Sequence, residues 1–95
     1  MNIHDLHTSE KPVSAVPFFK SEEGTVIALQ IEGNEVLKEH ITKVPALLIC
    51  IEGEATFENE KGVKKILFPG NYVNIEAMVK HKVTAVSKSN LMLIK

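Results

Sequence analysis

The chain has 95 residues, which is enough for one domain with a single core and too few for two. Apolar residues make up 44% of it and charged residues 24%, the mix of an ordinary soluble globular protein. Lysine supplies all 11 basic residues, and 12 acidic residues bring the net charge to -1. Arginine, which binds phosphate and guanine through two parallel hydrogen bonds, is absent, and this argues against a nucleic-acid partner.

No membrane or secretion signal is visible in the sequence. The longest apolar run, Val44 to Ile51, is far shorter than the ~20 residues that a helix needs to span a bilayer. Residues 1–12 contain no apolar stretch of the signal-peptide kind, and the single cysteine, Cys50, has no partner for an intramolecular disulfide. We therefore expect a cytoplasmic protein with no membrane partner. We also expect a polar N-terminal leader, residues 1–12, followed by one β-barrel domain, residues 13–95.

Short apolar segments separated by turn signals predict an all-β fold, since strands spaced about 8–12 residues apart are typical of sandwiches and barrels. Residues 45–51 are apolar on both faces, which favours a central strand. Ala55 and Phe57 alternate with polar neighbours and are expected to face inward. No helix longer than one turn is expected. The predicted strands cover residues 25–32, 36–42, 45–51, 54–58, 62–68, 72–75, 81–86 and 91–94.

Two turns between these strands have recognisable chemistry. Gly33-Asn34 predicts a tight hairpin, because both residues tolerate a positive φ. Pro69-Gly70 predicts a second turn, in which proline fixes φ at one position and glycine frees the next. The predicted segments and turns together favour a closed barrel or sandwich.

The chain resembles a small single-domain cupin from about residue 24 to residue 95. The Ile-Glu-Gly-Glu turn at residues 51–54 and the Phe-Pro-Gly-Asn turn at residues 68–71 carry the resemblance. The second cupin motif reaches its histidine twelve residues after the proline, which here is His81. The first motif, counted back from the glycine of the first turn, places its two histidines and its glutamate on His40, Thr42 and Ala46.

This resemblance implies a double-stranded β-helix, a jelly-roll barrel whose interior holds the site. In metal-binding cupins, three histidines and one glutamate hold a divalent transition metal. Here Ala46 has no donor atom and the hydroxyl of Thr42 is a poor ligand, so His40 and His81 would hold a metal only weakly. The cofactor stays unassigned. The residues expected to line the cavity are His40, Thr42, Ala46, Leu48, Met78, His81 and Val83.

Three other side chains are weaker candidates for the missing ligands. Cys50 shares a strand face with Ala46 but lies about 13 Å further along the strand, so we expect it in the core. Glu39 alternates away from His40, and Glu76 takes the place of a common loop proline.

The histidines also have structural interpretations. His4 and His7 form an H-x-x-H pair that fits a polar leader, or a tail that folds over a barrel and adds imidazoles to the site. His40 and His81 fit a functional remnant of the cupin site, or a hydrogen-bonded pair in the core. The sequence leaves both alternatives open.

Three functions from different classes follow. The first is a non-enzymatic cupin barrel that binds a small molecule in a cavity whose metal site is degenerate. The second, which is the alternative to the first, is a metal-dependent cupin enzyme, an oxygenase or isomerase, with the metal held by His40 and His81. The third is a structural or interaction module, which a solidly packed barrel interior would favour.

A homodimer is expected on physical grounds. Residues 45–51 present apolar side chains on two faces, and one barrel buries only one of them. A domain of this size buries only about 60% of its unfolded surface, so it gains from a partner. Val13 to Phe19 is the segment expected to cross to the second subunit.

Overall fold

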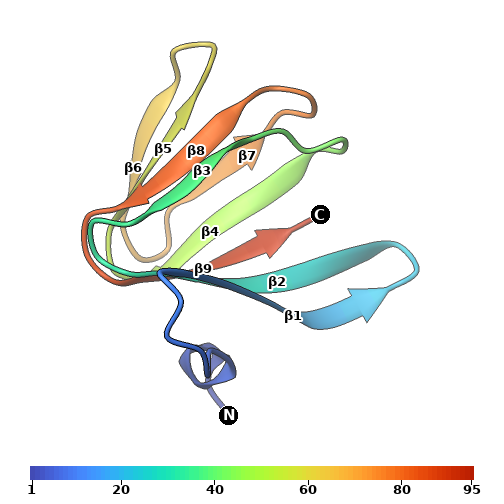
Figure 1. Cartoon of the computed structure of the whole chain (residues 1–95). Helices are drawn as coiled ribbons and strands as arrows, with labels where there is room; N and C mark the ends of the chain where they lie inside the picture. The colour runs from blue at the N-terminus through green and yellow to red at the C-terminus, as the bar shows by residue number, and fades with distance from the viewer.

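The computed structural model describes residues 1–95 and contains nine strands and one short 3-10 helix. The strands form two antiparallel sheets that face each other, as Figure 1 shows. The larger sheet has the order β1–β2–β9–β4–β7, with β1 at Val13–Ser21, β2 at Gly24–Ile31, β9 at Ser89–Ile94, β4 at Ala46–Glu52 and β7 at Tyr72–Ile75. The smaller sheet has the order β3–β8–β5–β6, with β3 at Val36–His40, β8 at His81–Ala85, β5 at Ala55–Asn59 and β6 at Lys64–Leu67.

The hydrophobic core lies between the sheets, because every second side chain of a strand points inward. The alternation of Ala55 and Phe57 is confirmed, since both are buried, and Cys50 is a core residue as expected. Full burial of a Leu, Ile, Val or Phe side chain contributes roughly 1.5–3 kcal/mol to the stability of the fold. The core cluster consists of Leu29, Ile31, Ala46, Leu48, Cys50, Ala55, Phe57, Leu67, Ile75, Val83, Ala85 and Leu91.

All eight predicted strands are present, and their ends differ from the prediction by at most two residues. Residues 45–51 form a central strand, since β4 lies between β9 and β7. The sequence pattern does not predict the remaining strand, β1. A bulge between Pro17 and Phe19 shifts its register against β2, so apolar and polar positions do not alternate along it.

The predicted hairpin at Gly33-Asn34 is wrong. Asn34 has the expected positive φ of 67°, but β3 pairs with β8 and not with β2. The turn therefore carries the chain from the larger sheet to the smaller one. The Pro69-Gly70 turn crosses in the same way from β6 to β7, with Gly70 at a φ of 90°. Alternation identifies a strand but does not say which other strand it joins.

The N-terminal segment lies outside the barrel. The helix η1, Ile3–Leu6, sits on the outer side of the larger sheet near β2 (Figure 1). Within residues 1–10 only Ile3 and His7 are partly buried. The chain has no helix with the length and apolar character needed to cross a membrane.

Candidate functional site

Two histidines from neighbouring strands of the smaller sheet meet at the strand ends. His40 is the last residue of β3, His81 is the first of β8, and the strand register places them opposite each other. Their ring centroids are 4.2 Å apart, with the planes tilted by 60°. The ring of Phe57 stacks on His81 at a centroid distance of 5.7 Å, and only 2% of His81 is exposed. The fold therefore brings together the two histidines that the motifs single out.

A backbone carbonyl sets the tautomer of each ring. Nδ1 of His40 lies 2.9 Å from the carbonyl oxygen of Lys38, and Nδ1 of His81 lies 3.1 Å from that of Val79. Because a carbonyl oxygen only accepts, each Nδ1 carries the hydrogen and each neutral ring keeps a lone pair on Nε2. Burial lowers the pKa of His81, and the nearby His40 lowers it further, while the Val79 carbonyl opposes this. His81 is therefore neutral at pH 7.

A buried hydroxyl without a partner lies two residues after His40. Thr42 is 7% exposed, and its Oγ1 makes no hydrogen bond. Its backbone carbonyl accepts from the amide of Met78 at 2.7 Å, which fixes the loop after β7 against the segment after β3. An unpartnered buried hydroxyl costs about 1–3 kcal/mol, and a ligand or an ordered water that supplied the missing bond would remove this cost.

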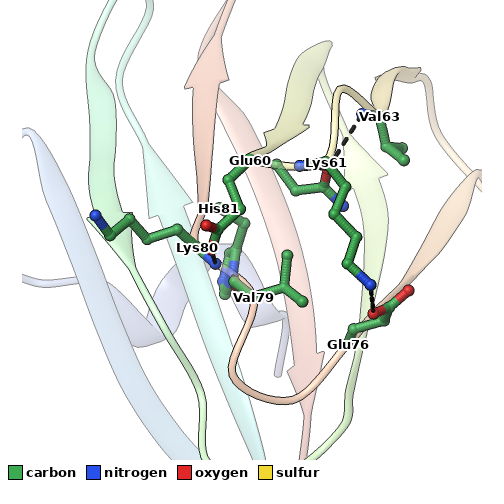
Figure 2. A network of polar contacts seen from close by, with 8 residues as sticks. Glu60, Lys61, Val63, Glu76, Val79, Lys80 and His81 are labelled. Carbon is green, nitrogen blue, oxygen red and sulfur yellow. Dashed lines mark hydrogen bonds and ion pairs between the residues drawn. The ribbon is translucent and has the colours of Figure 1, made fainter.

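The loop between β7 and β8 is fastened to the β5–β6 turn, as Figure 2 shows. Lys61 Nζ donates to the carboxylate of Glu76 at 2.8 Å. Glu60 holds the other end of the loop twice: its carboxylate accepts from the amide of Lys80, and its own amide donates to the Lys80 carbonyl at 2.9 Å. The carbonyl that orients His81 lies between these attachments. The β5–β6 turn therefore supports the orientation of the His81 ring.

Neither a family model nor a curated protein matches the sequence. Solved structures match the fold. A cupin superfamily protein from Desulfitobacterium hafniense superposes with a TM-score of 0.85 at 16% identity, over 98% of this chain and 84% of that chain. A cupin-2 domain containing protein from Shewanella frigidimarina gives 0.81 at 19% identity, over 100% of this chain and 92% of that one. This chain has the cupin fold.

A third similar structure specifies the architecture. It is an RmlC-like cupin family protein with a double-stranded β-helix fold from Methanocaldococcus jannaschii, with a TM-score of 0.79 at 19% identity over 94% of this chain and 84% of that one. The cupin double-stranded β-helix that the two motifs imply is thereby confirmed. At these identities the likeness concerns the fold, and the function has to be argued from the side chains.

The donor atoms around the histidine pair do not complete a cupin metal site. No three His, Cys, Asp or Glu side chains come together in a way that could hold a metal ion. Glu39 is exposed, and Glu76 is bonded to Lys61. Burial raises the pKa of the Cys50 thiol, despite an opposing hydrogen bond to a backbone carbonyl, and so keeps it protonated. With Ala46 at the glutamate position, two imidazoles and a hydroxyl are left, and this set does not fit a tightly held metal.

The other residues expected to line a cavity have different positions. Leu48 and Val83 are each 1% exposed and belong to the core, whereas Met78 is 61% exposed, in the β7–β8 loop, with a φ of 66°. The hollows of this barrel open at its surface, and its interior is packed, which is the feature that favours the structural or interaction module. One, of about 400 Å³, runs along β3 from Val36 to His40 and reaches the start of β1. His40 is the one predicted cavity residue that borders it, and the same ring contacts His81.

Sequence reasoning did not identify the groups that hold His81 in place. Phe57 was expected to face inward, but its contact with His81 depends on the pairing of β5 with β8. Glu60 and Lys61 sit in a surface turn, where charged residues are ordinary, so nothing in their sequence context indicates that they fasten the β7–β8 loop.

Proposed function

We propose that this chain is a non-enzymatic cupin barrel that binds a small molecule beside the His40–His81 pair. The observation that carries the proposal is that both Nε2 atoms keep a lone pair with no partner in the chain. The unpartnered hydroxyl of Thr42 supports it, and so does the hollow that His40 borders. The volume of that hollow, about 400 Å³, falls in the usual range of small-molecule sites.

The free groups define the chemistry of the ligand. A neutral imidazole accepts a hydrogen bond at its unprotonated nitrogen, so the ligand has to present a donor such as a hydroxyl or an amide N–H. Val13, Val36 and Leu37 line the same hollow and suit an apolar portion of the ligand, while Lys38 and Glu39 add charged groups. We therefore expect a small alcohol or amide with an apolar body.

A screen of small alcohols and amides against the ¹⁵N-labelled protein tests the proposal. Binding is expected to shift the amide signals of residues 36–42 and 81–84, and the compounds are expected to be recovered unchanged. In His81→Phe, which keeps a planar ring but removes the acceptor, the shifts should disappear. In His4→Gln, which removes an exposed imidazole elsewhere, they should persist. Compounds that bind His81→Phe as well as the wild type, or a library with no binder, would contradict the proposal.

The second candidate function is a metal-dependent cupin enzyme, an oxygenase or isomerase. The two free Nε2 atoms on adjacent strands favour it, because neutral imidazole nitrogens are common metal ligands. The incomplete donor set opposes it. The metal content of the purified protein separates the two candidates.

We also propose that the barrel works as a homodimer. Support comes from the outer face of the larger sheet, where apolar side chains from adjacent strands lie next to one another. Phe19 at the β1 edge is 59% exposed and Tyr72 at the β7 edge is 63% exposed. Val13 to Phe19, which was expected to cross to the partner, pairs here with β2 of its own chain. The apolar strip between the two edges consists of Val26, Leu47, Ile49, Met92 and Ile94.

A further inference from the structure

A row of polar side chains is buried on the outer side of the larger sheet, away from the core. The strand register places Ser14 opposite Gln30 and Gln30 opposite Asn90, and these residues are 7%, 8% and 2% exposed. Gln30 Nε2 donates to Asn90 Oδ1 at 3.0 Å, and Asn90 Nδ2 donates to the carboxylate of Glu52 at 2.7 Å. The N-terminal segment, residues 1–10, lies on this side of the sheet (Figure 1).

His7 attaches the N-terminal segment to this row. Its Nδ1 lies 2.8 Å from Oγ of Ser14, while its Nε2 is buried and has no hydrogen-bond partner. Pro12, which follows this segment, is held to the sheet by its own hydrogen bond, since the amide of Glu32 donates to the Pro12 carbonyl at 2.9 Å. Residues 1–10 can therefore leave the sheet without unpairing β1 from β2.

The surroundings of His7 favour its neutral form. A protonated ring would place an N–H at Nε2, where no acceptor is available. Burial lowers the pKa of His7 most, followed by His4 in the same segment and Lys88 from the loop before β9. No carboxylate is among the charges that act on the pKa of His7. Asp5 lies 3.5 Å from His4, and Glu32 lies 3.7 Å from Lys88.

We infer that residues 1–10 are a pH-sensitive strap: neutral His7 holds the segment on the sheet, and protonation of His7 releases it and uncovers Ser14, Gln30 and Asn90. A histidine in the released segment titrates near pH 6.5, whereas the docked one titrates lower. Between these two values the released state binds more protons, so docking weakens as the pH falls below 6.5 and levels off below the docked value. Docking is constant at higher pH.

Amide hydrogen exchange of the full chain, followed by NMR at a series of pH values from about 8 to about 5, tests the strap. Protection factors of Asp5 and His7, whose amides are hydrogen-bonded within the segment, should fall several-fold as the pH drops below 6.5. These factors correct for the intrinsic pH dependence of exchange. Those of the core strands should change far less. In His7→Gln, whose side chain can bond to Ser14 but does not titrate, protection should not depend on pH. The matched control, His4→Gln, should still lose protection as the pH falls, but at a pH closer to 6.5, because one of the charges that lower the pKa of His7 is removed.

The ring signals of His7 in the wild type supply a second measurement that needs no variant. They should titrate with a midpoint below 6.5, at the pH where protection is lost. Protection that is independent of pH in the wild type would overturn the inference. Equal losses of protection in His7→Gln and in the wild type, or a His7 midpoint at or above 6.5, would overturn it as well.

Discussion

The hydroxyl of Thr42 is buried without a hydrogen bond, so the residue lowers the stability of the barrel that contains it. Thr42→Val keeps the shape of the side chain and removes the polar atom. We expect it to raise the free energy of unfolding by about 1 kcal/mol and the melting temperature by roughly 4–8 °C. Thermal unfolding followed by circular dichroism measures this.

Thr84→Val, on the outer face of β8, is the matched control for that substitution. The hydroxyl of Thr84 faces away from the core, so the melting temperature of the Thr84→Val protein should stay close to that of the wild type. A Thr42→Val protein that melts below the wild type would show that the hydroxyl has a partner in the folded chain. If Thr42→Val stabilises the barrel, then Thr42 lowers the stability of the wild type, as is expected of a residue that is kept for binding.

His81 makes the stability of the fold depend on pH. Burial holds its pKa below 6.5 in the folded barrel, while in the unfolded chain it titrates near 6.5. Between these values the unfolded chain binds more protons, so the free energy of unfolding should fall as the pH drops below 6.5 and level off below the folded pKa. Urea unfolding from about pH 8 to about pH 5 measures the slope.

Two variants show which histidines cause this dependence of stability on pH. His81→Phe should retain only the part contributed by His7, whose pKa burial also lowers. The double variant His7→Gln/His81→Phe should lose nearly all of it. A slope that stays unchanged in both would mean that neither buried imidazole controls acid sensitivity.

At the scale of the elements, two glycines with the same φ have different surroundings. Gly53 and Gly70 both have a φ of 90°. A Cβ on Gly53 would collide with the carbonyl oxygen of Lys88, whereas one on Gly70 would meet nothing within 4 Å. Gly70→Ala should therefore cost about 1–2 kcal/mol from backbone strain alone, and Gly53→Ala clearly more. Urea unfolding of the two variants compares the costs, and equal losses would contradict the predicted clash.

The outer strip of the larger sheet leads to a prediction about assembly. Ile49 lies near the centre of this strip, opposite Met92 on β9 and Tyr72 on β7. Ile49→Lys should convert a dimer to a folded monomer, because a lysine placed in an apolar interface has no partner for its charge. Light scattering after gel filtration measures the mass. Ile66→Lys, on an exposed position of the smaller sheet, should leave the dimer intact, and a wild-type monomer at micromolar concentration would contradict the proposal.

The positions of eight of the nine strands could be predicted from the sequence, but their pairing could not. Alternation of side chains located Phe57 and the central strand β4, because burial on one face has a period of two residues. The hairpin at Gly33-Asn34 was wrong, since turn residues permit a reversal without selecting its partner strand. The strand β1 was missed for a different reason, since its bulge interrupts the alternation of side chains.

For the whole molecule, the resemblance carried by two motifs predicted the cupin barrel and placed His40 and His81 at its site, and the structure adds that the two rings face each other. It did not predict the ring tautomers, which depend on the carbonyls of Lys38 and Val79. It also did not predict that His7 bonds to Ser14 on the outer sheet face, because the distance between two segments in space is set by strand pairing. The fold is therefore more predictable than its site.

Metal content tests most directly whether this barrel is a binding protein with a degenerate metal site. It is measured by mass spectrometry on tag-free protein, for the wild type, His40→Ala and His81→Ala. Because only two imidazoles face each other and no carboxylate joins them, we predict a transition-metal content well below one per chain, the same in all three proteins. A near-stoichiometric metal in the wild type that both variants lose would contradict this account and favour the metal-dependent enzyme.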